Sequence, residues 1–258
     1  MDEQFHGLIQ KFVEINKKGY IKGINNNLLN SCGLTFENLL SKKADSMFFP
    51  DYEGIEIKCK QRYSRYDISL FSISFDGPYL FESNYLLQTY GMCDREFADK
   101  KQLFINFKYK EKVLVNNKYY FELDIDYENE MIFLNIYNTN GEFIEKRGFV
   151  DYKSINDRIK DKLDNLAVVY ASKKKINDDL YFRYYKLVCY KYRGFDSFIK
   201  LLEKNIVKVS LVLRFAKSGA DIGKNKNKNM VFKINDQDLI RLFHMIHFSQ
   251  IFRLNSVL

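Results

Sequence analysis

The sequence predicts a mixed α/β (α+β) fold in which helices flank a central mixed sheet and two lobes lie about a cleft. Segments whose apolar residues have helical spacing are interleaved, along the whole chain, with segments that alternate apolar and polar residues. No repeat or linker interrupts the series, and 46% hydrophobic with 29% charged residues is a globular composition. Because helices and strands are intermixed, we expect a single domain over residues 1–258.

The chain contains no run of about 20 uncharged apolar residues, and its first residues lack the basic and apolar regions of a signal peptide. The four cysteines are scattered without a C-x-x-C pair, which is typical of reduced, buried thiols. We therefore expect a cytoplasmic protein with no membrane contact. A net charge of +8 favours a polyanionic partner such as nucleic acid. AT-rich coding would also enrich lysine, so a uniformly solvated basic surface is the alternative.

In the first third of the chain, apolar spacing predicts a helix over residues 5–13. Thr35 is expected to cap a short helix over 36–42. Strict alternation predicts a strand over 55–61, with Ile55, Ile57 and Cys59 on a buried face and Glu56, Lys58 and Lys60 on the other. A second alternating segment, 68–75, is expected to pair beside it.

Further along, residues 119–125 and 131–137 read as a hairpin. The remaining expected elements are a helix through Ile155, Ile159 and Leu163 with Ser154 as its N-cap, a strand over 166–171, a helix capped at Asp196, a strand over 207–215, a loop over 217–229, a strand over 230–234 and a helix capped near Asn235.

Residues 50–58 contain the candidate catalytic and metal-binding groups. Asp51 precedes the strand at a turn, from which it can fold back over the start of the strand, and Glu56 and Lys58 project from one face because they lie two residues apart. Mg²⁺ could be held by Asp51, Glu56 and the backbone carbonyl of Ile57. Lys58, next to two carboxylates and a phosphate, would orient or polarise the attacking water rather than remove its proton. The residue types therefore suit metal-dependent phosphodiester hydrolysis.

The order of these residues is the P-D-x(n)-E-x-K arrangement of the PD-(D/E)xK nuclease superfamily, including the proline. The motif alone is degenerate, and a solvated face of an edge strand is the competing interpretation. Further segments add specificity, and in chain order they are residues 33–40, 51–58, 69–71, 121–126, 162–169, 206–209, 217–219 and 232–235.

Taken together, these segments resemble the MvaI/BcnI restriction endonuclease family, which in turn is similar to the mismatch-repair nickase MutH. The resemblance implies a PD-(D/E)xK restriction-endonuclease-like fold with a DNA cleft between two lobes. The catalytic lobe would come mainly from the N-terminal half and the DNA-recognition lobe mainly from the C-terminal half. It also implies metal-dependent cleavage of double-stranded DNA at a short specific sequence by a protein that can act as a monomer.

The resemblance assigns the metal carboxylates to Asp51 and Glu56 and the catalytic lysine to Lys58. Glu37 matches a helix glutamate that supports the active site in the family, although from the sequence alone it would be taken for a solvated helix residue. In two places the chain departs from the family. Residues 224–229 read Lys-Asn-Lys-Asn-Lys-Asn where the family has histidines close to DNA, and the chain continues beyond the matched region through His244 and His247 to Leu258.

Several basic residues are candidate DNA contacts. In the 224–229 segment, lysines that can bind phosphate alternate with amides that can read base edges. The candidates are Lys224, Lys226 and Lys228 in this loop, Arg214 and Lys217 beside it, and Lys60 and Arg62, which continue the active-site face of the strand. A flexible charged loop and a solvated strand face are the alternatives.

Two other metal readings are weaker. The acidic series Asp124, Asp126, Glu128 and Glu130 lacks the glycine and the final glutamate of a calcium loop, which favours the polar face of a hairpin. His244 and His247 lie three residues apart without a third ligand nearby.

We therefore expect a bacterial type II restriction enzyme that hydrolyses phosphodiester bonds with Mg²⁺, in a system that includes a cognate DNA methyltransferase. A MutH-like strand-nicking endonuclease of DNA repair and a non-catalytic DNA-binding module are the alternatives. The presence of Glu37, Asp51, Glu56 and Lys58 argues against the latter.

Overall fold

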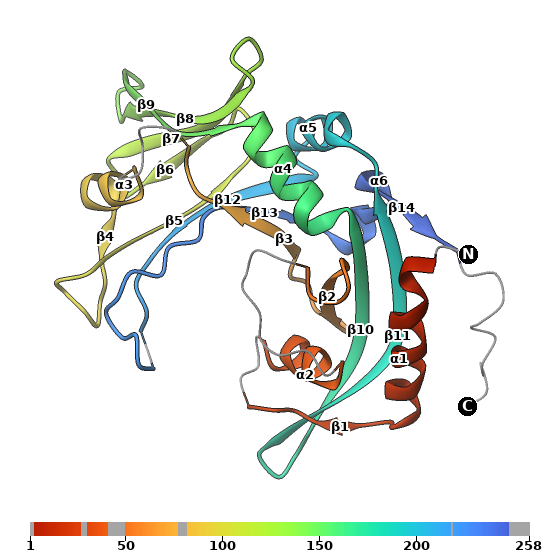
Figure 1. Cartoon of the computed structure of the whole chain (residues 1–258). Coiled ribbons are helices and arrows are strands. Elements are labelled where there is room, and N and C mark those ends of the chain that lie inside the picture. The colour runs from red at the N-terminus through yellow and green to blue at the C-terminus, as the bar shows by residue number, and fades with distance from the viewer. Residues whose placement is uncertain (1–2, 27–29, 41–49, 77–81, 218, 248–258) are drawn as a thin grey trace. The chain divides into compact units, whose positions relative to one another are not determined.

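The structure is a computed structural model that describes residues 3–26, 30–40, 50–76, 82–217 and 219–247 (Figure 1). The chain divides into two compact units, each assembled from segments that are distant in sequence. The first unit consists of Met1–Ile68, Lys160–Gly194 and Leu239–Leu258, and the second of Ser69–Ile159 and Phe195–Asp238. No helix among the described residues is both long and apolar enough to cross a membrane.

The first unit is built on one sheet. Its strand order is β1 (Ile21–Lys22), β11 (Asp179–Tyr192), β10 (Asn165–Ile176) and β2 (Glu56–Gln61), and β14 (Phe243–Ile246) also pairs with β11. β10 and β11 form a long antiparallel ladder, whereas β2 runs parallel to β10 with Glu56 opposite Leu166. Helix α1 (His6–Lys17) contacts β11 and helix α2 (Ser31–Leu39) contacts β2.

The core of the first unit lies between these helices and the sheet. Leu8, Ile9, Phe12 and Ile15 recur at helical spacing and are all buried, so they form the inner face of α1. The ring of Phe36 from α2 packs against that of Tyr184 from β11, with centroids 5.0 Å apart. The core therefore fixes α2 against the sheet that carries β2.

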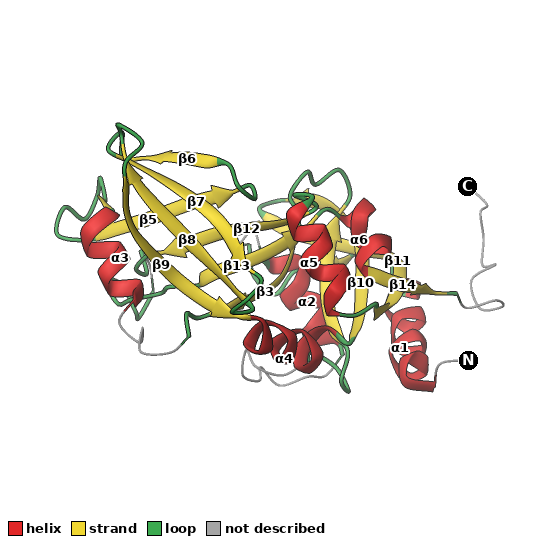
Figure 2. Ribbon diagram, turned by 90° about the horizontal axis from the view of Figure 1, so that it is seen from above, coloured by secondary structure: helices red, strands yellow, loops and turns green. Residues whose placement is uncertain are grey.

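The described residues of the second unit form two sheets (Figure 2). One has the order β3 (Ile68–Ile73), β13 (Asn229–Ile234), β12 (Val207–Leu213), β5 (Lys101–Phe107) and β4 (Met92–Cys93). The other is an antiparallel meander of β6 (Lys112–Val115), β7 (Tyr119–Asp126), β8 (Met131–Asn138) and β9 (Phe143–Asp151).

Helices α3 (Glu82–Tyr90) and α5 (Phe195–Glu203) belong to the second unit, and α4 (Tyr152–Leu163) follows β9. On the first of its sheets, Phe71 stacks on Phe232 with ring centroids 4.8 Å apart, and Phe198 of α5 packs against both rings. α5 thus covers one face of the β3–β13–β12 part of this sheet.

The expected mixed α/β fold is confirmed, with its strands divided among three sheets. Helices α1, α4 and α5 overlap the predicted segments, and β7 and β8 pair as the predicted hairpin. The prediction that residues 68–75 pair beside the active-site strand was wrong. β3 pairs with β13, and β2 pairs with β10, because alternation defines the faces of a strand but not its neighbour.

The predicted caps also need correction. α2 already begins at Ser31, so Thr35 is an internal, buried residue whose hydroxyl accepts a hydrogen bond from the backbone N–H of Ile24 at 3.2 Å. The end of the predicted 36–42 helix, residues 41 and 42, lies outside the described residues. α4 begins at Tyr152, and the carboxylate of Asp151, not Ser154, caps it by accepting the Ser154 N–H at 2.5 Å.

The helix predicted after Asn235 is short. A 3₁₀ turn, Asp236–Asp238, and helix α6 (Leu239–Leu242) give way to β14, so His244 lies in a strand opposite Lys191. The spacing of His244 and His247 therefore does not place them on one helical face.

Candidate active site

A tight turn brings Asp51 to the start of β2. Tyr52 and Ile55 exchange backbone hydrogen bonds of 2.9 and 2.7 Å, and Glu53 and Gly54 between them adopt left-handed conformations with φ of 44° and 80°. Glycine adopts this conformation without strain. The turn folds the chain back, so that Oδ2 of Asp51 accepts the backbone N–H of Ile57 at 2.9 Å. The Asp51 carboxylate therefore lies against the strand that carries Glu56 and Lys58.

Glu56 is a buried carboxylate with two lysine partners. Its side chain is 1% exposed, its Oε1 contacts Nζ of Lys58, and Nζ of Lys162 lies 3.3 Å from the same oxygen. Lys162 comes from the last turn of α4. The other carboxylate oxygen, Oε2, is buried and has no hydrogen-bond partner among the described residues.

Burial raises the pKa of Glu56, because the ionised form loses hydration. The charge of Lys58 lowers this pKa, the charge of Asp51 raises it further, and Lys162 opposes the increase. The site thus holds a carboxylate whose negative charge is only partly compensated by the protein.

β2 differs from the predicted strand in its environment. The contact between Lys58 and Glu56 agrees with their expected position on one face, but that face is not solvated, since Glu56 and Lys60 are both buried. Lys162 covers one end, and the ammonium of Lys60 donates to the backbone carbonyl of Tyr66. A side chain from α4 and the backbone of the turn after β2 therefore contact the polar face of the strand.

Glu37 lies on α2, which packs against β2. Its carboxylate and Cys59 both lie beside Gly33. A Cβ atom placed on Gly33 would be 3.6 Å from Oε1 of Glu37 and 4.0 Å from Cβ of Cys59. Hydrogen bonding with Cys32, burial, and the charges of Glu37 and Asp51 raise the pKa of the Cys59 thiol well above its ordinary value. The carboxylates of Glu37 and Asp51 therefore both raise the pKa of Cys59 on β2, which places Glu37 near the site.

The donor set at this strand is one of hard oxygens. No group of three or more His, Cys, Asp or Glu side chains suited to a metal occurs among the described residues. Two carboxylates and a backbone carbonyl would supply three protein oxygens, the kind of ligand that Mg²⁺ prefers. The unpartnered Oε2 of Glu56 and the adjacent Asp51 carboxylate fit a bound divalent cation, which would complete the compensation of their charge.

The turn after β2 is rich in exposed basic and aromatic residues. Arg62 lies over the ring of Tyr63 at 5.0 Å, and Tyr63 and Tyr66 are 86% and 77% exposed. Arg65 is also exposed. Of these residues only Arg62 was a predicted DNA contact, although the repeated Arg-Tyr pair at 62–63 and 65–66 is visible in the sequence. Lys162, by contrast, has no local pattern that marks it as a neighbour of Glu56.

Arg214 and Lys217 follow β12 in the second unit. Nε of Arg214 is buried and has no hydrogen-bond partner among the described residues. Nζ of Lys217 lies 2.6 Å from Asp94 and 3.8 Å from Glu96, and the hydrogen bond from Lys217 lowers the pKa of Asp94. Lys217 thus forms ion pairs with two carboxylates of its own unit.

The Lys-Asn alternation at 224–229 has a structural explanation. Asn227 accepts the backbone N–H of Arg214 at 2.8 Å, and Asn229 bonds Ser74 and Ser83. The lysines, Lys224, Lys226 and Lys228, are exposed, and Lys224 pairs with Asp221. Asn227 and Asn229 therefore hold the segment to the rest of the second unit by hydrogen bonds, and the lysines form its exposed side.

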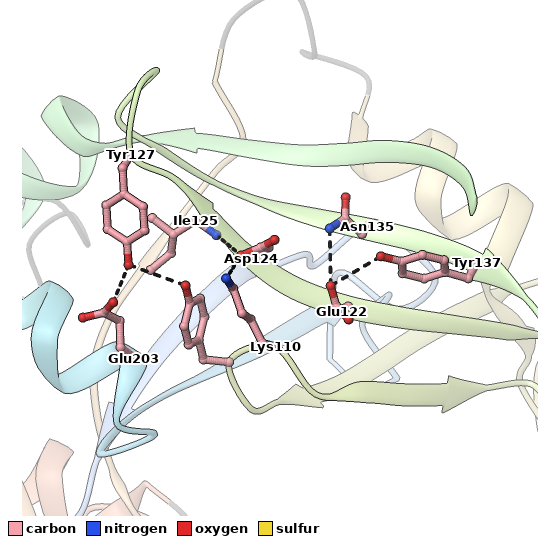
Figure 3. Close-up of polar contacts among 9 residues, drawn as sticks. Lys110, Glu122, Asp124, Ile125, Tyr127, Asn135, Tyr137 and Glu203 are labelled. Atoms are coloured by element: carbon pink, nitrogen blue, oxygen red, sulfur yellow. Dashed lines mark hydrogen bonds and ion pairs between the residues drawn. The ribbon is translucent and has the colours of Figure 1, made fainter. Parts of the chain in front are cut away.

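The acidic series in the β7–β8 hairpin is a polar sheet face (Figure 3). Lys110 lies 3.8 Å from Asp124, and Asn135 and Tyr137 both donate to Glu122 at 3.4 Å. Asp126 accepts two hydrogen bonds from Asn129 in the turn. These contacts agree with the hairpin interpretation of the series.

Comparison with known proteins gives a consistent result. The family model of the MvaI/BcnI restriction endonuclease family matches residues 9–243. A solved structure of MvaI in complex with its cognate DNA substrate is 24% identical, covers 95% of this chain and 98% of its own, and has a TM-score of 0.87. MvaI in the absence of DNA is 23% identical with the same coverage and a TM-score of 0.59. No curated protein sequence gives a significant match.

Proposed function

The chain belongs to the MvaI/BcnI restriction endonuclease family and is a type II site-specific deoxyribonuclease, and we propose that it hydrolyses phosphodiester bonds at the site formed by Asp51, Glu56 and Lys58. The single observation that carries the assignment is the buried, partly compensated Glu56 carboxylate with Asp51 folded against its strand. Glu37 would support this site from α2.

Restriction endonucleases generally use divalent metal ions, and we propose Mg²⁺ held by Asp51, Glu56 and the carbonyl of Ile57. When bound, Mg²⁺ lowers the pKa of a water ligand and stabilises the charge that develops on the scissile phosphate. Lys58, held at Glu56, would orient the attacking water. The water oxygen forms a bond to phosphorus and releases a proton to solvent while the bond to the 3′ oxygen breaks, which leaves a 5′ phosphate and, after protonation of the leaving oxygen, a 3′ hydroxyl.

Double-stranded DNA is the proposed partner, a choice that the resemblance to the DNA complex of MvaI supports. In the first unit, exposed Arg62 would contact phosphates together with Arg65. In the second unit we assign Arg214, Lys224, Lys226 and Lys228 to DNA. Lys60 and Lys217 have protein partners, and we propose that they chiefly hold their own segments in place.

These assignments give the first unit the catalytic role and the second unit the larger part in DNA recognition. We further propose that the protein acts as a monomer in the bacterial cytoplasm, where its substrate is found, and that a cognate DNA methyltransferase protects the host sequence.

The test is cleavage of supercoiled plasmid DNA by the purified chain with Mg²⁺. We expect linear fragments from the wild type and at least about a hundredfold loss with Glu56→Gln or Lys58→Met, since each removes a group that acts on the reacting atoms. Glu53→Gln is the matched control, because Glu53 is an exposed carboxylate in the same turn. Equal cleavage by Glu56→Gln and the control would contradict the proposed site. Nicked circles as the final product would favour a strand-nicking enzyme instead.

A further inference from the structure

An interstrand row of polar side chains crosses the second unit at β5, β12 and β13, which lie side by side in Figure 1. Asn106 is the register partner of Ser210, and Lys208 is the register partner of Lys233. Partners in an antiparallel ladder share a face of the sheet. Nζ of Lys233 donates to Oγ of Ser210 at 2.9 Å, and Oγ of Ser210 bonds Oδ1 of Asn106 at 2.6 Å.

This row lies on the face opposite the apolar core of the sheet. The alternate residues of the same strands, Ile105, Val209, Leu211 and Phe232 among them, are buried. On the row's own face, Asn106 and Lys208 are exposed and Phe104 is 55% exposed, whereas Val231, the register partner of Ser210, is buried. Ser210, at 4% exposure, is the buried link between two more accessible side chains.

The direction of the hydrogen bonds follows from the chemistry of lysine. An ammonium group donates and cannot accept, so Ser210 accepts from Lys233, and its own hydroxyl proton is donated to Oδ1 of Asn106. The atom of Asn106 that faces Ser210 is therefore the carbonyl oxygen. Among the described residues, the two amide N–H bonds of Asn106 and the other N–H bonds of Lys233 have no further partner, so the accessible groups of these two side chains are donors.

Base edges in the major groove differ in the pattern that they offer. Guanine presents two adjacent acceptors, N7 and O6, whereas adenine presents an acceptor and a donor. A free asparagine suits adenine, because its amide can accept and donate at once. Here the hydroxyl of Ser210 occupies the carbonyl oxygen of Asn106, so only the amide N–H groups of Asn106 can bind a base.

We propose that Asn106 and Lys233, held in register by Ser210, form a specificity-determining row that recognises a guanine in the target sequence through N7 and O6. This inference rests on the proposed function, since it requires that the second unit contacts duplex DNA. It deepens that function by naming the base and the donors that read it.

The experiment begins with the target sequence, obtained by sequencing the ends of random DNA fragments cut by the wild-type chain. Each guanine of the target is then replaced singly by 7-deazaguanine, which lacks the N7 acceptor. We expect one guanine whose replacement slows wild-type cleavage about tenfold, because one acceptor of the bidentate contact is lost while O6 remains. With Asn106→Ala or Lys233→Met, the natural target should be cut more slowly and the 7-deazaguanine effect at that position should disappear.

Ser210→Ala provides a second readout that does not depend on the overall rate. Without the hydroxyl, the amide of Asn106 can rotate and accept from adenine, so the preference for guanine over adenine at that position should fall about tenfold. Asn140→Asp, an exposed position in the turn after β8, is the matched control and should keep the wild-type preference.

The possible failures are distinguishable. If the wild type cuts at a specific target and every variant keeps its response at each guanine, or if the target contains no guanine, this inference is overturned and the proposed function stands. If the wild type cuts no DNA with Mg²⁺, the proposed function falls and this inference with it.

Discussion

Glu56 combines burial, two lysine partners and an unpartnered oxygen in one residue. Such an arrangement is costly to folding, because a buried carboxylate needs its charge and its lone pairs satisfied. The two lysines satisfy only one of its oxygens. Lys162 therefore stabilises the fold by compensating the charge of Glu56.

We predict that Lys162→Met lowers the free energy of unfolding by about 1–3 kcal/mol, the usual cost of removing a partner from a buried charged group. In a Glu56→Gln background the same substitution should cost less, because no charge is left to compensate. Urea unfolding of the four proteins in this cycle measures the coupling between the two residues. Lys160→Met, an exposed lysine on the same helix, is the control, and equal effects of the two lysine substitutions would refute the coupling.

At the level of elements, the N-terminus of α4 depends on Asp151 and not on Ser154. We predict that Asp151→Ala destabilises the protein by about 0.5–2 kcal/mol, the range measured for loss of an N-cap. Thermal unfolding tests this prediction. Asp157→Ala is the control, since it removes only an exposed pair with Lys153 and should change the stability little. The cap assignment is wrong if the two aspartates behave alike.

The Lys217 segment is linked to the chain near β4 by Asp94, which also accepts the backbone N–H groups of Glu96 and Phe97. The pKa of Asp94 is lowered from 3.8 by the hydrogen bond from Lys217. An acid whose pKa is lower in the folded state stabilises folding above its unfolded pKa, and this contribution is lost as the pH falls through the folded value.

We therefore predict that Asp94→Asn is less stable than the wild type at neutral pH and that the difference narrows as the pH falls below 3.8. Urea unfolding as a function of pH measures this. A difference that stays constant across the acid range would mean that the ionised form of Asp94 does not stabilise the fold.

Helices and strands also show what could and could not be predicted from the sequence. The periodicity of α1 and of the β7–β8 hairpin is regular, and both were located correctly. β11 was missed because exposed Tyr185 stands beside buried Tyr184, so apolar residues occupy both faces and hide the alternation. At the site, Asp51, Glu56 and Lys58 could be grouped because they are close in sequence. Lys162 and the Asn106–Ser210–Lys233 row depend on strand pairings that no local pattern specifies.

For the whole molecule, the net charge of +8 predicts that DNA binding depends steeply on salt. Each phosphate that the protein neutralises adds about −0.9 to the slope of log K against log salt concentration. Replacing Lys224, Lys226 and Lys228 together by glutamine should make this slope shallower by about 0.9 for every phosphate that these lysines neutralise. DNA binding measured with Ca²⁺ in place of Mg²⁺ at a series of salt concentrations tests this prediction. An unchanged slope would remove these lysines from the DNA interface.

The division into two units also constrains the order in which the protein can become active. The chain passes between the units four times, after Ile68, Ile159, Gly194 and Asp238. During synthesis, β2 with its carboxylates leaves the ribosome long before β10, the strand with which it pairs. A nascent or prematurely terminated chain that ends before Asn165 therefore lacks the strand that orders β2, and it also lacks β12 and β13. The carboxylates of the proposed site are therefore not fixed on their sheet until β10 has been made.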